Sequence, residues 1–418
     1  MDYVNKLLQK IKLVNKKINI FTIILFLIFP NNVIAQLQIY TDKSLPSLGW
    51  ELPEKANPNY ETLVHYSLKS QTNILLGGRY EISGNKNPYK FKFELNKDEN
   101  LNLKKKIYDQ MQNTAIESYI LYENGAIVVD EISPEDRFGK YINNQTLLNS
   151  RSIGKTAVSY LMGHAICMGY IPSVEHVIND WPLIENTLYH KQKLIDLLNM
   201  NAGDQEYIIW EKGLISTGRW SNNHSIKSFA ENELKNSKKS DSYYNYNEVV
   251  TNVLMSYIVH KSQGNFQKVL DETFQKKVKI SNSLYFKKHL ACKEDEGCAI
   301  GNFAATRYDY LRFAKAMLDD WHNDTCVGKY LKKTHEKRIQ KNDRTRDGST
   351  SFSFPQGYGG QSHFDYGGMK ERVVLGMEGY GGQSILIDFD RKRIISVHSI
   401  HRNYDWGSLV YDEIKNRK

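Results

Sequence analysis

Strand-forming segments lie on both sides of a long helical stretch, and this order constrains the fold more than any other feature. Residues 119–122 and 126–129 are rich in aliphatic and aromatic side chains, and they flank Asn124-Gly125. Asn and Gly both tolerate positive φ, which makes this pair the strongest short hairpin signal. Strand patterns return near the C-terminus, at 384–388 and 394–398, around a turn at 390–393.

The stretch between these two regions is mainly helical, from about residue 152 to 340. Segments 193–200, 249–260 and 308–321 carry apolar residues at the spacing of one helix face, and a last helix is expected over 405–415. A single sheet assembled from both ends of the chain explains this order. We therefore expect an α/β (α+β) fold, with an antiparallel sheet flanked by helices, a helical lobe over about residues 165–345, and a cleft between them.

The first 35 residues have the pattern of a secretory signal peptide. Five lysines precede an apolar run from Ile18 to Phe29, Pro30 ends the run, and Val33-Ile-Ala35 suits a cleavage site. The run is short for a membrane span, although an uncleaved N-terminal anchor is the alternative. No other stretch is long enough to span a bilayer. We expect an exported protein, periplasmic or secreted, without membrane attachment after cleavage.

The remaining chain divides into a lead-in segment, residues 36–112, and a main domain, residues 113–418. The lead-in segment is polar and rich in Asn and Lys, and we expect it to pack on the main domain. Removal of the signal lowers the formal net charge from +9 to +5, because residues 1–35 carry five Lys and one Asp. This charge is mild and scattered, so it does not favour a nucleic-acid partner.

The four cysteines are Cys167, Cys292, Cys298 and Cys326. Disulfides form in oxidising compartments, and Cys292 and Cys298 bracket a short acidic loop, so we expect these two to pair. Cys167 lies in an apolar helical stretch, where we expect a buried free thiol. No cysteine spacing is typical of a metal site, and no cofactor is implied.

The strongest chemical motif is Ser152-Ile-Gly-Lys155 before an apolar helical stretch. In a helix, a hydroxyl and an ammonium group three residues apart lie on one face. Desolvation and the positive potential of a helix N-terminus both help Lys to lose its proton, and neutral Lys can accept the serine proton. The alternative is that Ser152 only caps the helix. Ser83-Gly-Asn-Lys86 has the same spacing but lies among turn residues.

Further motifs follow in one order, namely Gly169-Tyr-Ile-Pro-Ser173 and Leu197-Leu-Asn-Met-Asn-Ala-Gly203. With the serine motif, they resemble the serine β-lactamase and penicillin-binding-protein superfamily, and most closely its class C-like branch of esterases and 6-aminohexanoate-oligomer hydrolases. The resemblance covers roughly residues 113 to 400. It implies a β-lactamase/transpeptidase-like fold and acyl transfer with Ser152 as nucleophile and Lys155 as proton acceptor.

The resemblance also implies a tyrosine on a loop before a helix. Within Tyr243-Tyr-Asn-Tyr-Asn247, only Tyr246 has Val and Leu seven and eight positions later, as the family pattern requires. We expect Tyr246 to act as general base and acid, and Tyr244 to form a wall of the cleft. Glu248 stands where the family usually has Asn or Ser, and we place it in the substrate pocket. A packed aromatic surface is the alternative for this cluster.

The third motif is Gly379-Tyr-Gly-Gly-Gln383, where penicillin-binding proteins carry K-T-G and the hydrolase branch carries G-x-x-G-Q. Glycines let a substrate approach the strand closely. The resemblance implies an oxyanion hole from the amides of Ser152 and Tyr380, with substrate contacts from Gly381, Gly382 and Gln383.

The expected substrate is an ester or a small amide. A β-lactam carries a carboxylate that K-T-G enzymes bind with a Lys, and this motif has no cation unless Lys370 or Arg372 reaches it. A β-lactamase or a D-Ala-type peptidase is the alternative within the same chemistry. A catalytically silent penicillin-binding-like receptor is the alternative outside it, although such a protein would be free to lose Ser152, Lys155 or Tyr246.

Overall fold

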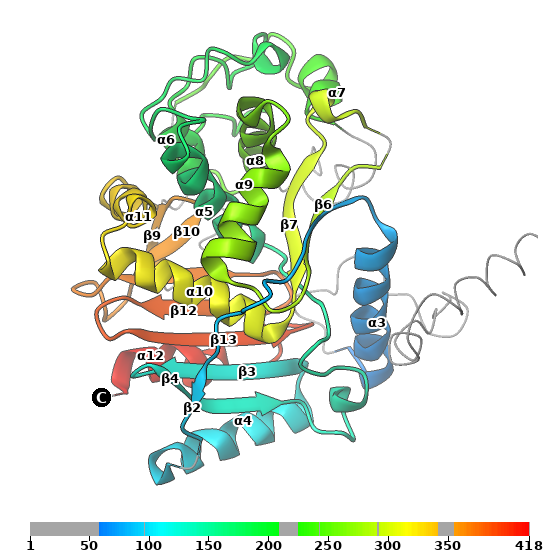
Figure 1. Ribbon diagram of the computed structural model, residues 1–418, viewed down its shortest axis with the longest axis vertical. Helices are drawn as coiled ribbons and strands as arrows, with labels where there is room; N and C mark the ends of the chain where they lie inside the picture. Colours follow the sequence, from blue (N-terminus) through cyan, green and yellow to red (C-terminus); the bar gives the residue numbers. More distant parts are fainter. Residues whose placement is uncertain are drawn as a thin grey trace, which may run out of the picture. The chain divides into compact units, whose positions relative to one another are not determined.

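A nine-stranded sheet forms the centre of the computed structural model, which describes residues 58–95, 97–208, 225–241, 243–290, 292–341 and 355–417. The strand order is β2-β4-β3-β13-β12-β11-β10-β9-β8 (Figure 1). The strands are β2 (Lys92–Phe93), β3 (Ile116–Glu123), β4 (Ala126–Ile132), β8 (Ile339–Gln340), β9 (Pro355–Gly359), β10 (Ser362–Tyr366), β11 (Val374–Glu378), β12 (Ser384–Asp388) and β13 (Arg393–Ser399).

Both ends of the chain meet in this sheet, as the sequence predicts. The β3–β4 hairpin turns at Asn124 and Gly125, which have φ angles of 52° and 84°. Strand β3 pairs antiparallel with the C-terminal β13, with Ile120 opposite Ser396. The sheet is antiparallel apart from the short parallel pairing of β2 with β4.

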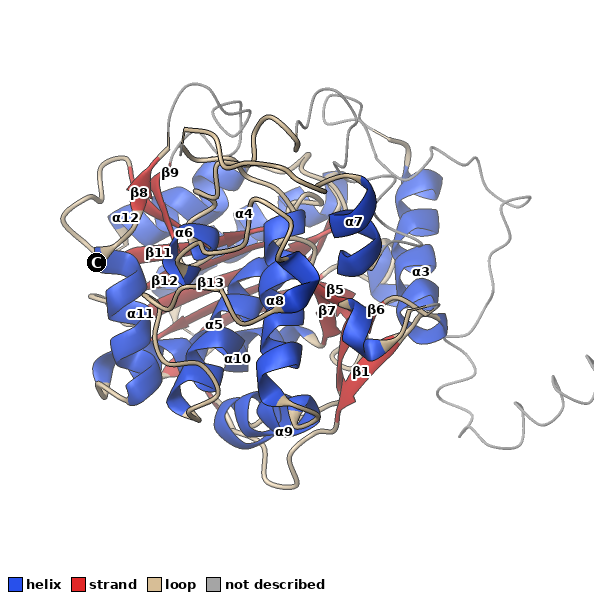
Figure 2. Ribbon diagram, turned by 90° about the horizontal axis from the view of Figure 1, so that it is seen from above, coloured by secondary structure: helices blue, strands red, loops and turns tan. Residues whose placement is uncertain are grey.

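Each face of the sheet packs against its own hydrophobic core. Along β3, Ile120 and Tyr122 belong to the larger core, whereas Tyr119 and Leu121 belong to the smaller one. This division follows from the alternation of side chains along a strand. Helix α4 (Leu101–Asn113) and the C-terminal helices η8 (Gly407–Tyr411) and α12 (Asp412–Asn416) lie on the smaller core, and α5 and α10 lie on the larger one (Figures 1 and 2).

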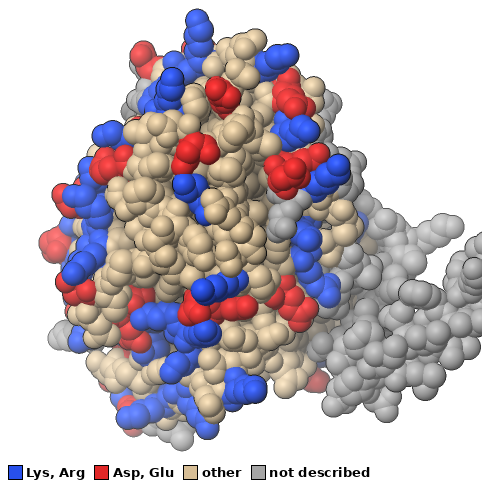
Figure 3. Space-filling model, turned by 45° about the horizontal axis from the view of Figure 1, so that its top comes forward, with Lys and Arg blue, Asp and Glu red and all other residues tan. Residues whose placement is uncertain are grey.

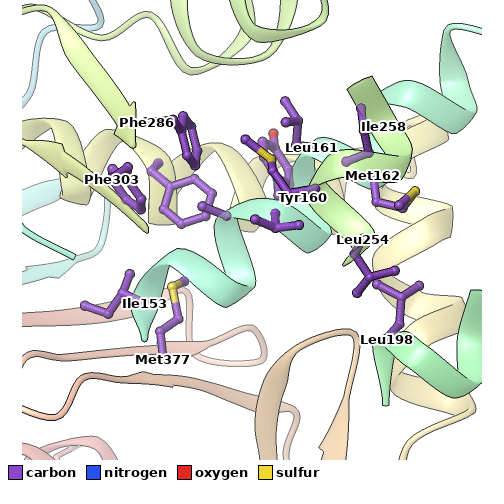
Figure 4. Packing of buried hydrophobic residues seen from close by; sticks show 14 of the residues in the cluster. Ile153, Tyr160, Leu161, Met162, Leu198, Leu254, Ile258, Phe286, Phe303 and Met377 are labelled. Atoms are coloured by element: carbon purple, nitrogen blue, oxygen red, sulfur yellow. The ribbon is translucent and has the colours of Figure 1, made fainter. Parts of the chain in front are cut away.

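The helical lobe surrounds α5, which runs through the larger core. Figure 4 shows Ile153 beside Met377 of β11 at one end of this helix, and Met162 near Ile258 at the other. The predicted helices at 193–200, 249–260 and 308–321 are confirmed. The helices of the lobe are α5 (Ile153–Cys167), α6 (Leu194–Leu198), α7 (Ile226–Asn232), α8 (Val249–Ser262), α9 (Phe266–Leu270), η5 (Asp271–Val278), α10 (Arg307–His322) and α11 (Cys326–Glu336).

A second, four-stranded sheet interrupts the helical middle, which the sequence analysis did not predict. Its order is β1-β6-β7-β5, with β1 (Arg79–Ile82), β6 (Leu284–Lys288), β7 (Ala299–Ala305) and β5 (Leu148–Asn149). Strand β1 comes from the lead-in segment, and α3 (Tyr60–Leu76) of the same segment lies beside β5. The lead-in segment therefore adds a strand to each sheet and packs on the main domain.

The cysteines form two disulfides. Cys292 and Cys298 are joined with their Cα atoms 5.7 Å apart, and they close the loop before β7. Cys167 is bonded to Cys326 with a Cα–Cα distance of 5.9 Å. The expected free thiol at Cys167 is therefore wrong. Cys167 is the last residue of α5 and is only half-buried, and Cys326, the first residue of α11, lies next to it.

The predicted signal peptide lies outside the described residues. Within the part of the chain that the structure describes, no helix combines the length and the hydrophobicity that crossing a bilayer requires. On the face shown in Figure 3, basic and acidic side chains are interspersed around a largely uncharged area.

The two disulfides predict different losses of stability. A cross-link stabilises mainly by restricting the unfolded chain, and the restriction grows with the length of the closed loop. Cys167 and Cys326 are 159 residues apart, against 6 for Cys292 and Cys298. We expect Cys167→Ser/Cys326→Ser to lower the free energy of unfolding by about 2–4 kcal/mol in urea titrations. The matched control, Cys292→Ser/Cys298→Ser, should lose less, and an equal or larger loss there would contradict the loop-length argument.

Candidate active site

Ser152 lies at the first turn of α5, directly after the short strand β5. It occupies the N-cap position, but its side chain makes no capping hydrogen bond. Instead, Lys155 Nζ donates a hydrogen bond to Ser152 Oγ over 3.3 Å. Lys155 is only 4% exposed, whereas Ser152 is half-buried. The alternative of a simple capping serine therefore does not describe this side chain.

The turn before Ser152 is held from the second sheet. Ser150 Oγ donates to Asn302 Oδ1 over 3.0 Å and accepts the backbone N–H of Phe303 over 2.9 Å. A Cβ atom at Gly154 would lie 2.1 Å from the carbonyl oxygen of Gly301, so only glycine permits this approach of α5 to β7. The second match to the motif differs, because residues 83–86 form no helix and Ser83 is exposed.

Tyr246 is the tyrosine that the structure brings to this pair. Lys155 Nζ lies 4.9 Å from the centre of the Tyr246 ring. The ring stacks on His363 with centres 6.2 Å apart and planes 23° apart, and it meets Tyr358 edge-on at 6.0 Å. Lys155 therefore lies next to both Ser152 and Tyr246, and the cluster joins two separated motifs of the sequence.

The loop that carries Tyr246 is fixed by the buried Asp204. The Nδ2 groups of Asn245 and Asn247 donate to the two carboxylate oxygens of Asp204 over 2.7 and 3.1 Å, and Tyr189 Oη donates over 2.9 Å. Asn247 Oδ1 also accepts the backbone N–H of Val250 at the start of α8. Burial raises the pKa of Asp204, and these hydrogen bonds act against the shift. Sequence reasoning did not select Asp204, although asparagines on both sides of Tyr246 were a usable signal.

One of the predicted pocket residues, Tyr244, occupies another position than expected, and the pocket position of Glu248 stays a prediction. Tyr244 is 0% exposed and packs against Tyr358 at 5.0 Å, so it supports the cluster from behind and does not form a wall of the cleft. Glu248 is the N-cap residue of α8, and its charge acts on Lys287 of β6. The pKa of Lys287 falls to about 8 through burial and the nearby Arg151 charge, and Glu248 acts in the opposite direction.

The third motif forms the turn between β11 and β12. Gly382 N donates to Gly379 O over 2.9 Å, which places Tyr380 and Gly381 at the tip. The turn adjoins the serine motif, since a Cβ atom at Gly379 would lie 3.2 Å from Arg151 Cβ. Gly382 has a φ of 87°, which favours glycine.

The side chains of this motif are engaged within the protein. Arg402 Nε donates to the Tyr380 carbonyl over 2.6 Å, and its guanidinium group lies 4.8 Å from the centre of the Tyr380 ring. Gln383 is 6% exposed, and its Nε2 donates to Ser399 O over 2.9 Å. The Nε2 group of Gln383 thus braces the end of β13, whereas its Oε1 accepts no hydrogen bond from the described residues, and the expected substrate contact stays a prediction.

The cations considered from sequence do not supply a charge to this turn. Arg372 donates to Asp388 Oδ2 over 2.8 Å and reaches carbonyl groups at the end of α12, and Lys370 is exposed. A different lysine, Lys341 of the segment after β8, lies close to the tyrosine cluster, where its Nζ is 2.9 Å from His363 Nδ1. Neither Lys341 nor His363 was selected from the sequence.

No group of three or more His, Cys, Asp or Glu side chains in the described residues is arranged to hold a metal ion. His164 and His398, which the sequence places in helix and strand patterns, are buried in the core. The described site places a serine hydroxyl next to a lysine, with a tyrosine ring beside the same lysine.

Comparisons with known proteins give structural neighbours only. No family model and no curated protein matches the sequence. A proposed 6-aminohexanoate-dimer hydrolase from Bacillus anthracis superposes with a TM-score of 0.59 at 13% identity, over 83% of this chain and 93% of that one. An octameric penicillin-binding protein homologue from Pyrococcus abyssi gives 0.55 at 14% identity, over 75% and 76%.

A β-lactamase/D-alanine carboxypeptidase from Pseudomonas syringae gives a TM-score of 0.53 at 14% identity, over 76% of this chain and 98% of that one. These neighbours share one architecture across most of their lengths, and the resemblance drawn from the motifs is confirmed at the level of the fold. The chain has the β-lactamase/transpeptidase-like fold of the serine β-lactamase and penicillin-binding-protein superfamily.

Proposed function

We propose that this protein is an exported serine hydrolase that cleaves an ester or a small amide through an acyl-enzyme on Ser152. The observation that carries the proposal is the contact of Lys155 Nζ with Ser152 Oγ at 3.3 Å, beside the Tyr246 ring. A hydroxyl nucleophile needs a positioned group that accepts its proton, and here that group is nearly buried. Two disulfides support export, because such bonds persist in oxidising compartments.

The reaction proposed for this site is acyl transfer in two stages. Ser152 Oγ attacks the carbonyl carbon, and its proton passes to neutral Lys155, whose charged form is disfavoured by burial. Lys155 passes this proton on to the Tyr246 oxygen, and Tyr246 delivers it to the leaving group, so that the ester or amide bond breaks and the acyl group stays on Ser152. Water then attacks the acyl-enzyme and gives its proton to the same pair of residues, which return a proton to Ser152 Oγ as the Oγ–acyl bond breaks and the acid is released. We assign the oxyanion to the amides of Ser152 and Tyr380.

A neutral substrate suits this site better than a β-lactam or a D-Ala-type peptide. Gly379-Tyr-Gly-Gly-Gln383 has no cationic side chain, Arg372 is held by Asp388, and Arg402, which stacks on Tyr380, is bonded to the Tyr380 carbonyl. Loss of a charge-assisted hydrogen bond to a substrate carboxylate costs about 1.5–3 kcal/mol, or one to two decades in affinity. A silent receptor is the weaker alternative, because the contacts between Ser152, Lys155 and Tyr246 are all in place.

Removal of the nucleophile tests the proposal. We expect Ser152→Ala to abolish hydrolysis of p-nitrophenyl acetate. Ser83→Ala is the matched control, since Ser83 belongs to the same S-x-x-K pattern but is exposed and not helical. Full activity in Ser152→Ala, or an equal loss in Ser83→Ala, would contradict the assignment.

Lys155→Arg separates proton transfer from charge. Arginine keeps the positive charge but stays protonated throughout the working pH range, so it cannot take the serine proton. We expect kcat to fall at least ~10²-fold, the lower range for loss of a general base. Lys86→Arg in the exposed motif is the control. Near-normal kcat in Lys155→Arg would rule out proton transfer to this residue.

A comparison of substrates tests the specificity. We expect kcat/KM for p-nitrophenyl acetate and butyrate to exceed that for nitrocefin, because only nitrocefin carries a carboxylate that needs a cation. A clear preference for nitrocefin would overturn the substrate assignment and leave the Ser152 chemistry intact.

A further inference from the structure

The side chains of Lys341, His363, Tyr246 and Lys155 follow one another through the proposed site. Lys341 Nζ lies 2.9 Å from His363 Nδ1, and the His363 imidazole stacks on the Tyr246 ring at 6.2 Å. Lys155 Nζ lies 4.9 Å from the centre of the same ring. The Tyr246 ring thus adjoins both the lysine of the serine motif and a histidine–lysine pair, in which His363 lies in β10 and Lys341 follows the edge strand β8.

We assign the imidazole tautomer of His363 from its hydrogen bond with Lys341, taking Lys341 as an ammonium group. An ammonium group only donates hydrogen bonds, so Nδ1 accepts and the ring proton resides on Nε2. The imidazole is therefore neutral. His363 is 3% exposed, and burial lowers its pKa well below the usual range, with the charges of Lys341 and Lys155 acting in the same direction. The positive charge of this pair is consequently the charge of Lys341.

The position of His363 is rigid because both helices of the proposed site are tied to the same hairpin. His363 lies in β10, opposite Tyr358 of β9. At the turn of this hairpin, Gln361 accepts hydrogen bonds from Thr156 of α5 over 3.0 Å and from Thr251 of α8 over 2.6 Å. The hairpin thereby joins the helix that carries Lys155 to the helix that follows Tyr246, and it presents His363 to the tyrosine.

We propose that His363 is a positioning residue for Tyr246, and that Lys341 acts through it to favour the deprotonated, reactive form of the tyrosine. This inference rests on the proposed function of the site. An imidazole that accepts from an ammonium group is electron-poor, and such a ring stacks favourably on an electron-rich phenolate. A nearby positive charge also favours the phenolate directly.

The groups around the tyrosine cluster come from several elements. Lys155 faces the Tyr246 ring from α5, Tyr358 meets it from β9, His363 from β10, and Tyr244 from the same loop. Beyond Lys341 lies Glu378 of β11, whose pKa burial raises to about 8, against the opposing effects of a hydrogen bond from Ser384 and the charges of Arg402 and Lys341.

The test is the pH profile of kcat/KM for p-nitrophenyl acetate between pH 5 and 10. Lys341→Gln keeps a hydrogen-bond donor for His363 but removes the charge. We expect the acidic limb of this variant to move to higher pH by about one unit. At pH values on the acidic side of the limb, kcat/KM should then be about tenfold lower than in wild type, whereas the alkaline plateau should stay close to wild type. His363→Phe keeps a ring beside Tyr246 but no acceptor, and its limb should move in the same direction.

Two further variants distinguish this role from a general structural one. Lys341→Arg restores the charge and should return the limb most of the way to wild type, whereas Lys370→Met removes an exposed lysine and is the charge control. The inference is overturned if the acidic limbs of Lys341→Gln and His363→Phe both coincide with that of wild type. It is also overturned if Lys341→Gln lowers kcat/KM equally at every pH and Lys341→Arg shows the same loss. Ser152→Ala is measured alongside. If it loses activity while the limbs stay fixed, only this inference fails, and if it stays active, the proposed function fails.

Discussion

The hydrogen bond between Lys155 Nζ and Ser152 Oγ requires that a lysine side chain lie almost buried at the first turn of a helix. Such a position is costly for an ammonium group, and it is possible only where the surroundings fix the helix start. Ser150 binds β7 through Asn302 and the Phe303 amide, and Gly154 lets α5 approach Gly301 closely. The second sheet therefore holds the turn that carries Ser152 from one side.

The large sheet holds the same site from the other side. The β11–β12 turn meets the residue before Ser152, and the β9–β10 hairpin binds α5 and α8 through Gln361. Tyr246 gains its position from Asp204 through the two asparagines that flank it in sequence. The polar groups of this arrangement are buried or half-buried and are bonded to elements that are themselves fixed, which is what a preorganised site requires.

The sequence was sufficient for those parts of the fold that local chemistry determines. Asn124-Gly125 predicts the hairpin because its two φ angles are positive, and the apolar periodicity at 249–260 and 308–321 predicts α8 and α10. The serine motif could be recognised because its residues are three apart in one helix. The second sheet was missed because β5 and β6 are short and pair with strands distant in sequence, including β1 of the lead-in segment.

The residues that sequence reasoning missed act only through tertiary contacts. His363 meets Tyr246 across 117 positions of chain, and no spacing rule connects an isolated His in a strand to a tyrosine before a helix. Asp204 follows a recognised motif, yet its role appears only when the Tyr246 loop folds over it. Likewise, the Cys167–Cys326 bond joins two helix ends that no local pattern brings together.

Intact-mass analysis with peptide mapping after exposure to a fluorophosphonate tests the central claim most directly. The account predicts one adduct per chain, located on Ser152, which disappears in Ser152→Ala and persists in Ser83→Ala. An adduct on another serine, or a folded protein that takes up no adduct, would contradict the assignment of Ser152 as the nucleophile.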